Sequence, residues 1–232
     1  MYSIVWQISV LLFVLFPRET EMQQPVITVA PSNPTEVLEG ENITLEWRYN
    51  LGGRPLLLMR FTRTVPSRVI VQKLSNTLLI PDSRVQANVT DAFSSISFVG
   101  VVRDDDGDYQ LEIQNDDIQN NPIAQNDLSL RVLFPPSFNS FSSDQVVVEG
   151  DPATITLSCS ADGNPTPKVS WTRVFDNASD SDVLFTGNSY VINNNRNNAG
   201  TYRCEADNGI GSAINQTIRV TIYCEYQNNS YC

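Results

Sequence analysis

The sequence contains no histidine, and this absence narrows the chemistry that the chain can perform. Histidine is the commonest general base, the commonest zinc ligand and the usual partner of a serine or cysteine nucleophile. The sequence also lacks a Gly-x-Ser-x-Gly nucleophile elbow and a glycine-rich phosphate loop. We therefore expect a protein that is not an enzyme and that binds neither a cofactor nor a metal ion.

Basic residues are also scarce, because 15 Lys and Arg stand against 26 Asp and Glu and give a net charge of −11. Nucleic-acid binding depends on clustered basic side chains, and an anionic membrane surface repels an acidic protein. This composition excludes a nucleic-acid partner and leaves membrane association only through a missing anchor or through a partner. Hydrophobic residues make up 41% of the chain and charged residues 18%, which is typical of a folded protein.

Long apolar runs are limited to one, over residues 4–16, and even that run is interrupted by Gln7 and Ser9. A membrane span needs about 20 apolar residues, whereas a short N-terminal run is typical of a secretory signal peptide. We assign residues 1–22 to a cleaved signal peptide, with a membrane anchor or a buried strand as the alternatives. The expected location is the extracellular space or the outer cell surface.

Glycosylation motifs agree with a secretory route. Two Asn-x-Thr triplets, at Asn33 and Asn164, carry proline in the middle position, which blocks modification. The five acceptor asparagines without such a proline are Asn42, Asn88, Asn177, Asn215 and Asn228.

The sequence reads as two similar halves that meet at Leu133-Phe134-Pro135-Pro136, where two prolines fix φ and remove two hydrogen-bond donors. We expect this segment to interrupt the strand ladder. Each half has an Asp/Asn-x-Gly-x-Tyr pattern late in its length and short alternating segments between turn residues, with no helical period. The predicted fold is all-β, with two tandem sandwiches. The expected divisions are residues 24–134, residues 135–222 and a cysteine-containing tail over residues 223–232.

Four residues of the second half carry a specific spacing: Cys159, Trp171, Tyr202 and Cys204. The pattern resembles the immunoglobulin fold, in which cysteines on strands B and F bridge two sheets, a tryptophan packs on the sulfurs and a tyrosine closes a corner. The resemblance implies a Cys159–Cys204 disulfide and an I-set domain of the kind found in adhesion molecules. Asn198 departs from the family, which usually has Asp there.

The first half resembles a V-set immunoglobulin domain without its disulfide. Trp47 stands at the strand B cysteine and Leu111 at the strand F cysteine, while Met59 or Phe61 takes the place of the core tryptophan. The distance of 64 positions from Trp47 to Leu111, against 45 between the cysteines of the second half, leaves room for an extra hairpin. Tyr109, which stands where Tyr202 does in the pattern shared by the two halves, is also expected in the core.

Two further motifs have more than one interpretation. Asp104 to Asp108 forms an acidic run, yet it fits an EF-hand calcium loop poorly, and the resemblance gives Asp105 a structural role as the partner of Arg84. We therefore favour a solvated turn. Cys224 and Cys232 could close a small loop as a second disulfide, bridge two chains or belong to a following module.

A partner-binding face follows from strand alternation in the first half. If Leu57, Met59 and Phe61 face the core, their neighbours point outward; the opposite register is the alternative. Gln114 is expected on the same outer face. The candidate contact residues are Leu56, Leu58, Arg60, Gln110 and Glu112.

The resemblance implies adhesion or recognition through a protein partner, homophilic or heterophilic. A V-set-like domain without the disulfide followed by an I-set domain is similar to carcinoembryonic-antigen-related adhesion molecules and to invertebrate immunoglobulin recognition receptors. The alternatives are a soluble immune-type decoy, a pathogen- or carbohydrate-binding molecule, or the truncated ectodomain of a signalling receptor.

Overall fold

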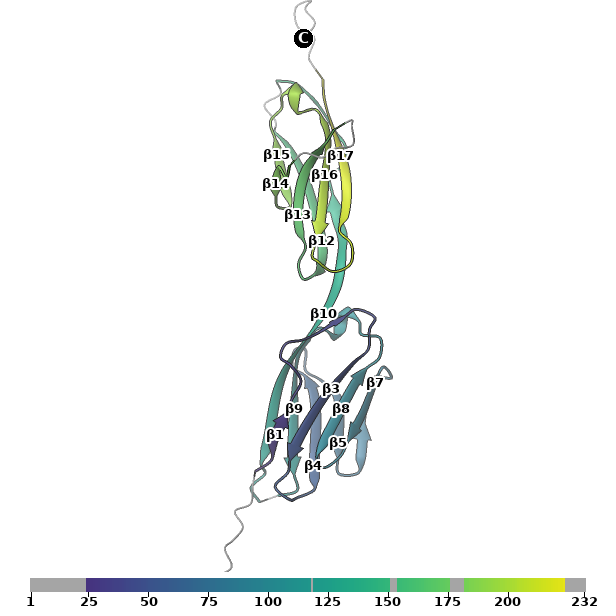
Figure 1. The fold of residues 1–232 in the computed structure, drawn as a ribbon, viewed down its shortest axis with the longest axis vertical. Coiled ribbons are helices and arrows are strands. Elements are labelled where there is room, and N and C mark those ends of the chain that lie inside the picture. The colour runs from purple at the N-terminus through teal and green to yellow at the C-terminus, as the bar shows by residue number, and fades with distance from the viewer. Residues whose placement is uncertain (1–23, 118, 151–153, 176–181, 224–232) are drawn as a thin grey trace, which may run out of the picture.

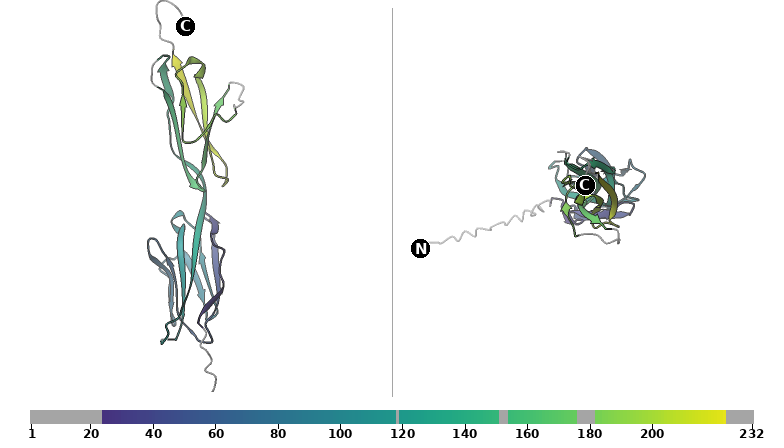
Figure 2. Two further views of the ribbon diagram at one scale, coloured as in Figure 1. Left: turned by 90° about the vertical axis from the view of Figure 1, so that its left-hand side faces the viewer. Right: turned by 90° about the horizontal axis from the view of Figure 1, so that it is seen from above.

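The computed structural model describes residues 24–117, 119–150, 154–175 and 182–223, which form two β-sandwiches placed end to end (Figures 1 and 2). The helical elements among these residues are two short 3-10 turns, η1 (Arg103–Asp105) and η2 (Arg196–Asn198). No helix in the described part of the chain has the length and apolar character to cross a membrane. The predicted all-β fold with tandem sandwiches is confirmed.

The first sandwich packs a four-stranded sheet against a larger one. The four-stranded sheet has the order β1 (Val26–Val29), β3 (Ile43–Asn50), β8 (Phe93–Phe98), β7 (Val85–Val89). The facing sheet runs β2 (Thr35–Leu38), β10 (Ile123–Phe141), β9 (Gly107–Asn115), β4 (Leu56–Arg63), β5 (Arg68–Leu74), β6 (Thr77–Leu79). The β5–β6 hairpin uses the extra length of this half.

The core of the first sandwich is held together across the two sheets without a disulfide. Trp47 is fully buried, lies 5.3 Å from the Phe61 ring and donates from Nε1 to Asn126 Oδ1 on β10 at 2.8 Å. Phe61 pairs with Leu111 just as Trp171 pairs with Cys204 in the second sandwich. Phe61, rather than Met59, therefore occupies the position of the core tryptophan.

The second sandwich has the same plan with fewer strands. One sheet joins the end of β10 to β12 (Ile155–Asn164) and β15 (Ser189–Ile192). The other has the order β11 (Gln145–Val148), β17 (Ile214–Tyr223), β16 (Gly200–Asp207), β13 (Lys168–Val174), β14 (Phe185–Thr186).

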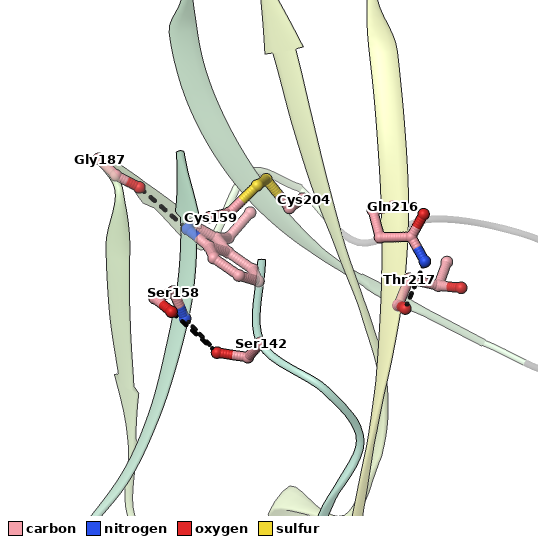
Figure 3. Close-up of a disulfide and its surroundings, with 8 residues drawn as sticks. Ser142, Ser158, Cys159, Gly187, Cys204, Gln216 and Thr217 are labelled. Carbon is pink, nitrogen blue, oxygen red and sulfur yellow. Dashed lines mark hydrogen bonds between the residues drawn. A yellow bond between two sulfur atoms is a disulfide. The ribbon is translucent and has the colours of Figure 1, made fainter. Parts of the chain in front are cut away.

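The predicted disulfide joins Cys159 on β12 to Cys204 on β16 and so bridges the two sheets of the second sandwich (Figure 3). Trp171 is fully buried in the same core, and its Nε1 donates to the Gly187 carbonyl at 2.9 Å. Cys224 and Cys232 lie outside the described residues, and so do residues 1–22, which were predicted to form a signal peptide.

Both sandwiches contain a tyrosine corner. Tyr109 donates its hydroxyl to the Asp105 carbonyl at 2.6 Å, and Tyr202 donates to the Asn198 carbonyl at 2.8 Å. The Arg84 guanidinium binds the Asp105 carboxylate with two hydrogen bonds, at 2.7 and 3.1 Å. In the second sandwich Asn198 instead donates to a nearby carbonyl, that of Asn193.

The carboxylates of the acidic turn in the first sandwich accept hydrogen bonds from groups on β10. Asp106 accepts the Val132 N–H at 2.9 Å, and Asp108 accepts the Ser129 hydroxyl at 2.7 Å. The Ser129 hydrogen bond, with help from the Arg131 charge, lowers the pKa of Asp108. These carboxylates hold β10 in place, which supports the structural interpretation of the turn.

We expect the first sandwich to lose stability at alkaline pH. Burial raises the pKa of both Tyr49 and Tyr109 from 10.0 to about 12. An unfolded chain ionises these groups near pH 10, so stability is full below about pH 10 and falls as pH rises toward about 12, by roughly 2 to 3 kcal/mol per tyrosine. Urea unfolding at a series of alkaline pH values measures this. The Tyr109→Phe variant should lose about half of the pH dependence, and a flat profile in the parent would contradict the assignment.

The ladder is interrupted at the junction, as expected, but the strand itself is not. The two prolines do not interrupt the strand, because β10 runs from the first sandwich into the second (Figure 1). Its ladder with β9 ends at Leu130, and its ladder with β12 begins at Phe134. The strand exchanges partners at this point, and Pro135 and Pro136 fall where the register with β12 shifts, so ladder donors are not required from them.

Candidate protein-binding face

The outer face of the larger sheet of the first sandwich was the predicted contact surface, and one of its predicted residues is misplaced. Leu56 is only 6% exposed and belongs to the core. The register between β4 and β9 shifts between Leu56 and Leu58, which is a β-bulge. A bulge inserts one residue into the alternation, so Leu56 turns inward and Leu57, expected in the core, is only half-buried.

Beyond the bulge the predicted alternation holds. Met59 and Phe61 are fully buried, whereas Leu58 and Arg60 are partly exposed. On β9, Leu111 and Ile113 are fully buried, whereas Gln110 and Glu112, which alternate with them, are partly exposed. The outer face therefore carries Leu58, Arg60, Gln110 and Glu112 as predicted neighbours, together with Gln114, which is nearly covered and donates to Asn121.

A row of polar side chains crosses four strands of this face. Arg60 donates from Nε to Gln72 Oε1 on β5 at 3.4 Å, and its Nη1 lies 3.4 Å from Glu112 Oε2 on β9. Gln125 on β10 donates to the other oxygen of Glu112 at 3.1 Å. We call Gln72, Arg60, Glu112 and Gln125 the polar row. Its two charges cancel, so the row is neutral but rich in donors and acceptors.

An apolar row runs beside the polar row. Leu58 on β4 pairs with Leu74 on β5 and with Gln114 on β9, which in turn pairs with Ile123 on β10. Leu74 and Ile123 are each 49% exposed. We call Leu74, Leu58 and Ile123 the apolar row. Exposed aliphatic side chains gathered next to polar ones are a feature of recognition surfaces.

A shallow hollow of about 460 Å³ lies at the polar end of the face. Its lining is mostly polar and includes Arg60, Gln72, Gln110, Glu112, Thr62 and Thr64. Hydroxyl, amide, guanidinium and carboxylate groups therefore converge on one concave site. The face combines shape, hydrogen-bonding groups and apolar surface within one sheet.

The three acceptor asparagines among the described residues lie away from this face. Asn42 precedes β3 and Asn88 lies on β7, both at the four-stranded sheet, and both are exposed. Asn42 uses its carbonyl oxygen to accept the Gly100 N–H at 2.8 Å, which leaves its amide nitrogen free. Asn215 is exposed on β17 of the second sandwich. Asn177 and Asn228 lie outside the described residues.

Sequence reasoning missed part of the face. Leu74, Ile123, Gln72 and Gln125 complete both rows, yet none was predicted. Each joins the face through cross-strand register, and the register of β5 and β10 depends on the bulge and on turn geometry. The available signal was the single apolar residue that ends β5, Leu74, which alternation alone could not assign to a side.

Comparisons with known proteins agree with this architecture. An immunoglobulin-domain family model matches residues 135–208. The chain is 31% identical over 192 residues to the peroxidasin homolog of Homo sapiens, a match that covers 82% of this chain and 12% of that protein. It is 27% identical over 199 residues to junctional adhesion molecule A of Rattus norvegicus, which covers 80% of this chain and 64% of that protein. The chain thus spans less than two thirds of the length of each of these relatives.

The fold is also similar to solved structures. The crystal structure of Dpr11 IG1 bound to DIP-gamma superposes with a TM-score of 0.70 at 20% identity, over 87% of this chain and 100% of that chain. The immunoglobulin-domain relatives support the prediction of a non-enzymatic chain, and the peroxidasin homolog does not alter this because so little of it is matched. With its sandwich topology, inter-sheet disulfide and tyrosine corners, the chain belongs to the immunoglobulin superfamily.

Proposed function

We propose that this chain is an extracellular adhesion or recognition protein that binds a protein partner through the outer face formed by the polar and apolar rows. The observation that carries the proposal is the arrangement of that face: Leu58 lies in an exposed apolar row directly beside hydrogen-bonding side chains. Apolar centres with polar surroundings are typical of protein interfaces.

The size of the exposed apolar surface bears on affinity. Leu74 and Ile123 are each about half exposed, so covering them contributes on the order of 1 kcal/mol each. Such a small gain has to offset the loss of translational and rotational freedom on binding. We therefore expect weak binding between single chains, strengthened by avidity when many copies are displayed on a surface.

The relatives support a recognition role. Junctional adhesion molecule A is named as an adhesion molecule, and Dpr11 IG1 forms a complex with DIP-gamma, another chain with IG domains. None of the acceptor asparagines among the described residues lies on this face. This also favours binding there, since a glycan on the face would cover the apolar row. The partner is either a second copy of this chain (homophilic binding) or a different protein (heterophilic binding), and a bead-clustering assay distinguishes the two.

We expect Leu58→Asp to abolish adhesion while the protein stays folded. A partner that covers the apolar row would desolvate a carboxylate placed there, which weakens binding by several kcal/mol, or roughly a hundredfold or more. The measurement is clustering of beads coated with the purified protein, alone and mixed with beads coated with extracellular proteins from the same source. Clustering of a single bead type indicates homophilic binding, and clustering only of mixed beads indicates heterophilic binding.

Val26→Asp is the matched control, because Val26 is 54% exposed on the other sheet. It should cluster like the parent protein. If Leu58→Asp is folded and still clusters, the binding face is elsewhere. If Leu58→Asp is unfolded, the half-buried leucine is part of the core, and the partner-facing role of the apolar row is then tested with Ile123→Asp.

A further inference from the structure

The two asparagines in Asn-Pro-Thr triplets both bind the main chain of β10. Asn33 donates to the Asp127 carbonyl at 3.2 Å and accepts the Ser129 N–H at 3.0 Å. Asn164 donates to the Val132 carbonyl at 2.8 Å. In each case the amide nitrogen that a glycan would occupy is a hydrogen-bond donor within the fold.

Asn164 is the more consequential of the two because it joins the two sandwiches. Between Leu130 and Phe134, β10 is paired with β2 along one edge, but along the other edge it has lost β9 as a ladder partner and has not yet gained β12. Side chains from both sandwiches fill this gap. Asp106 of the first accepts the Val132 N–H at 2.9 Å, while Asn164 of the second donates to the carbonyl of the same residue. The Asn164 amide also lies 3.3 Å from Asp106 Oδ2 and so connects the two directly.

A second amide reinforces the junction. Asn208 donates to the Phe134 carbonyl at 2.9 Å and to the Pro165 carbonyl at 2.8 Å. The space around these groups is full, because a Cβ added to Gly163 would lie 2.8 Å from Asn208 Nδ2. A substituent on the Asn164 amide nitrogen would meet the Val132 carbonyl and Asp106, which that nitrogen already contacts.

The junction also contains an ionic contact, which is the weaker component. Arg103 lies 3.9 Å above the Phe134 ring, its Nε is 3.1 Å from a Glu39 carboxylate oxygen and its Nη1 is 3.5 Å from Asp162 Oδ2. All three charged side chains are at least one-third exposed. Exposed ion pairs contribute little and are screened by salt. The half-buried amide of Asn164 is therefore the better candidate for the group that fixes the two sandwiches relative to each other.

We propose that Asn164 locks the two sandwiches into one rigid unit and that Pro165 protects this lock by keeping Asn164 from being glycosylated. The triplet Asn164-Pro165-Thr166 is one proline away from an acceptor site in a chain with five acceptor sites. Glycosylation would replace one of the two amide hydrogens of Asn164 with a bulky, solvated branch, at a nitrogen that contacts both the Val132 carbonyl and Asp106. The protective role of Pro165 rests on the proposed extracellular location, whereas the locking role of Asn164 does not.

The locking role is tested on the full two-domain chain with Asn164→Asp. This variant keeps the size of the side chain but replaces its donor with an acceptor that faces the Val132 carbonyl and Asp106. Small-angle X-ray scattering should show a broader spread of interdomain distances and a smaller mean maximum dimension, with unchanged melting of each sandwich. Arg103→Gln is the comparison and should change the scattering less. If Asn164→Asp scatters like the parent protein, Asn164 is not the lock.

The protective role is tested by secretion of Pro165→Ala and of Pro165→Ala/Thr166→Ala from eukaryotic cells. Only the single variant restores an acceptor triplet, so its tryptic peptide should carry a glycan at Asn164. After the glycans are trimmed to one sugar, its scattering should resemble that of Asn164→Asp. The double variant should be unmodified at Asn164 and as rigid as the parent. The protective role is overturned if Pro165→Ala carries no glycan at Asn164, if it carries one but stays as rigid as the parent, or if the double variant loses rigidity. Glycans at Asn42 and Asn88 in the same samples show whether the protein passes through the secretory pathway, on which the protective role depends.

Discussion

Replacing Cys159 and Cys204 together by alanine should lower the free energy of unfolding of the second domain by about 4 kcal/mol and leave the first domain unchanged. The bridge closes a loop with a sequence separation of 45, and the restriction of the unfolded chain by a loop of that length accounts for an effect of this size. Both sulfurs are in the core, and Trp171 is fully buried beside them, so two cavities add to the loss.

Hydrogen exchange measured by mass spectrometry during urea unfolding can follow each domain separately. Peptides from β12 and β16 should lose protection at lower urea in the double variant, and peptides from β3 and β9 should not. Reductant should act on the parent protein in the same domain-selective way. Equal sensitivity of both domains to reductant would contradict the alignment of the two halves, and a Cys159 peptide linked to Cys224 or Cys232 in a non-reduced digest would contradict the pairing.

The sequence predicted the elements that depend on short-range spacing. Residues two positions apart lie on one face of a strand, so the spacing of Trp47, Tyr109 and Leu111 within their segments predicts core positions, and all three are buried. The Cys159–Cys204 pairing followed from a resemblance that combines four spaced residues. Repetition of one pattern in both halves then indicated two sandwiches.

The features that the sequence did not predict depend on register and on contacts between distant segments. A single bulge moved Leu56 from the surface to the core, and alternation carries no signal for a bulge that lacks glycine. Leu74 lies beside Leu58 only through the pairing of β5 with β4, and Ile123 joins the row through Gln114 of β9, which pairs with both Leu58 and Ile123. The contact of Asn164 with Val132 joins two domains, and local sequence cannot specify it.

The first domain has to hold its two sheets together without a disulfide, and the structure indicates how it does so. Trp47 takes the position of one cysteine and fills the space with an indole that packs against Phe61. Phe61 in turn stacks on Tyr109 with ring centroids 5.1 Å apart. The Trp47 indole also crosses to the other sheet, where Asn126 on β10 accepts its N–H. Aromatic packing plus one directed hydrogen bond thus links β3 to the facing sheet.

Trp47→Ala should therefore destabilise the first domain by about 3 to 5 kcal/mol, because a fully buried large aromatic side chain is removed and a cavity remains. Trp47→Phe separates the contribution of side-chain volume from that of the hydrogen bond to Asn126. It restores much of the volume but leaves the Asn126 carbonyl oxygen without its indole donor, so we expect a smaller loss of roughly 1 to 3 kcal/mol. Chemical unfolding followed by hydrogen exchange in β3, β8 and β9 measures both variants, with the second domain as an internal reference.

Asn126→Leu supplies the complementary measurement, since it leaves the indole N–H without an acceptor while adding no charge. If the hydrogen bond is a structural link between the sheets, Trp47→Phe combined with Asn126→Leu should be less destabilised than the sum of the two single variants, because removing both partners leaves no buried group unsatisfied. Strict additivity would mean that Trp47 stabilises the domain by volume alone. A loss below about 1 kcal/mol for Trp47→Ala would mean that the first domain holds its sheets together by contacts other than those at the position of the missing cysteine.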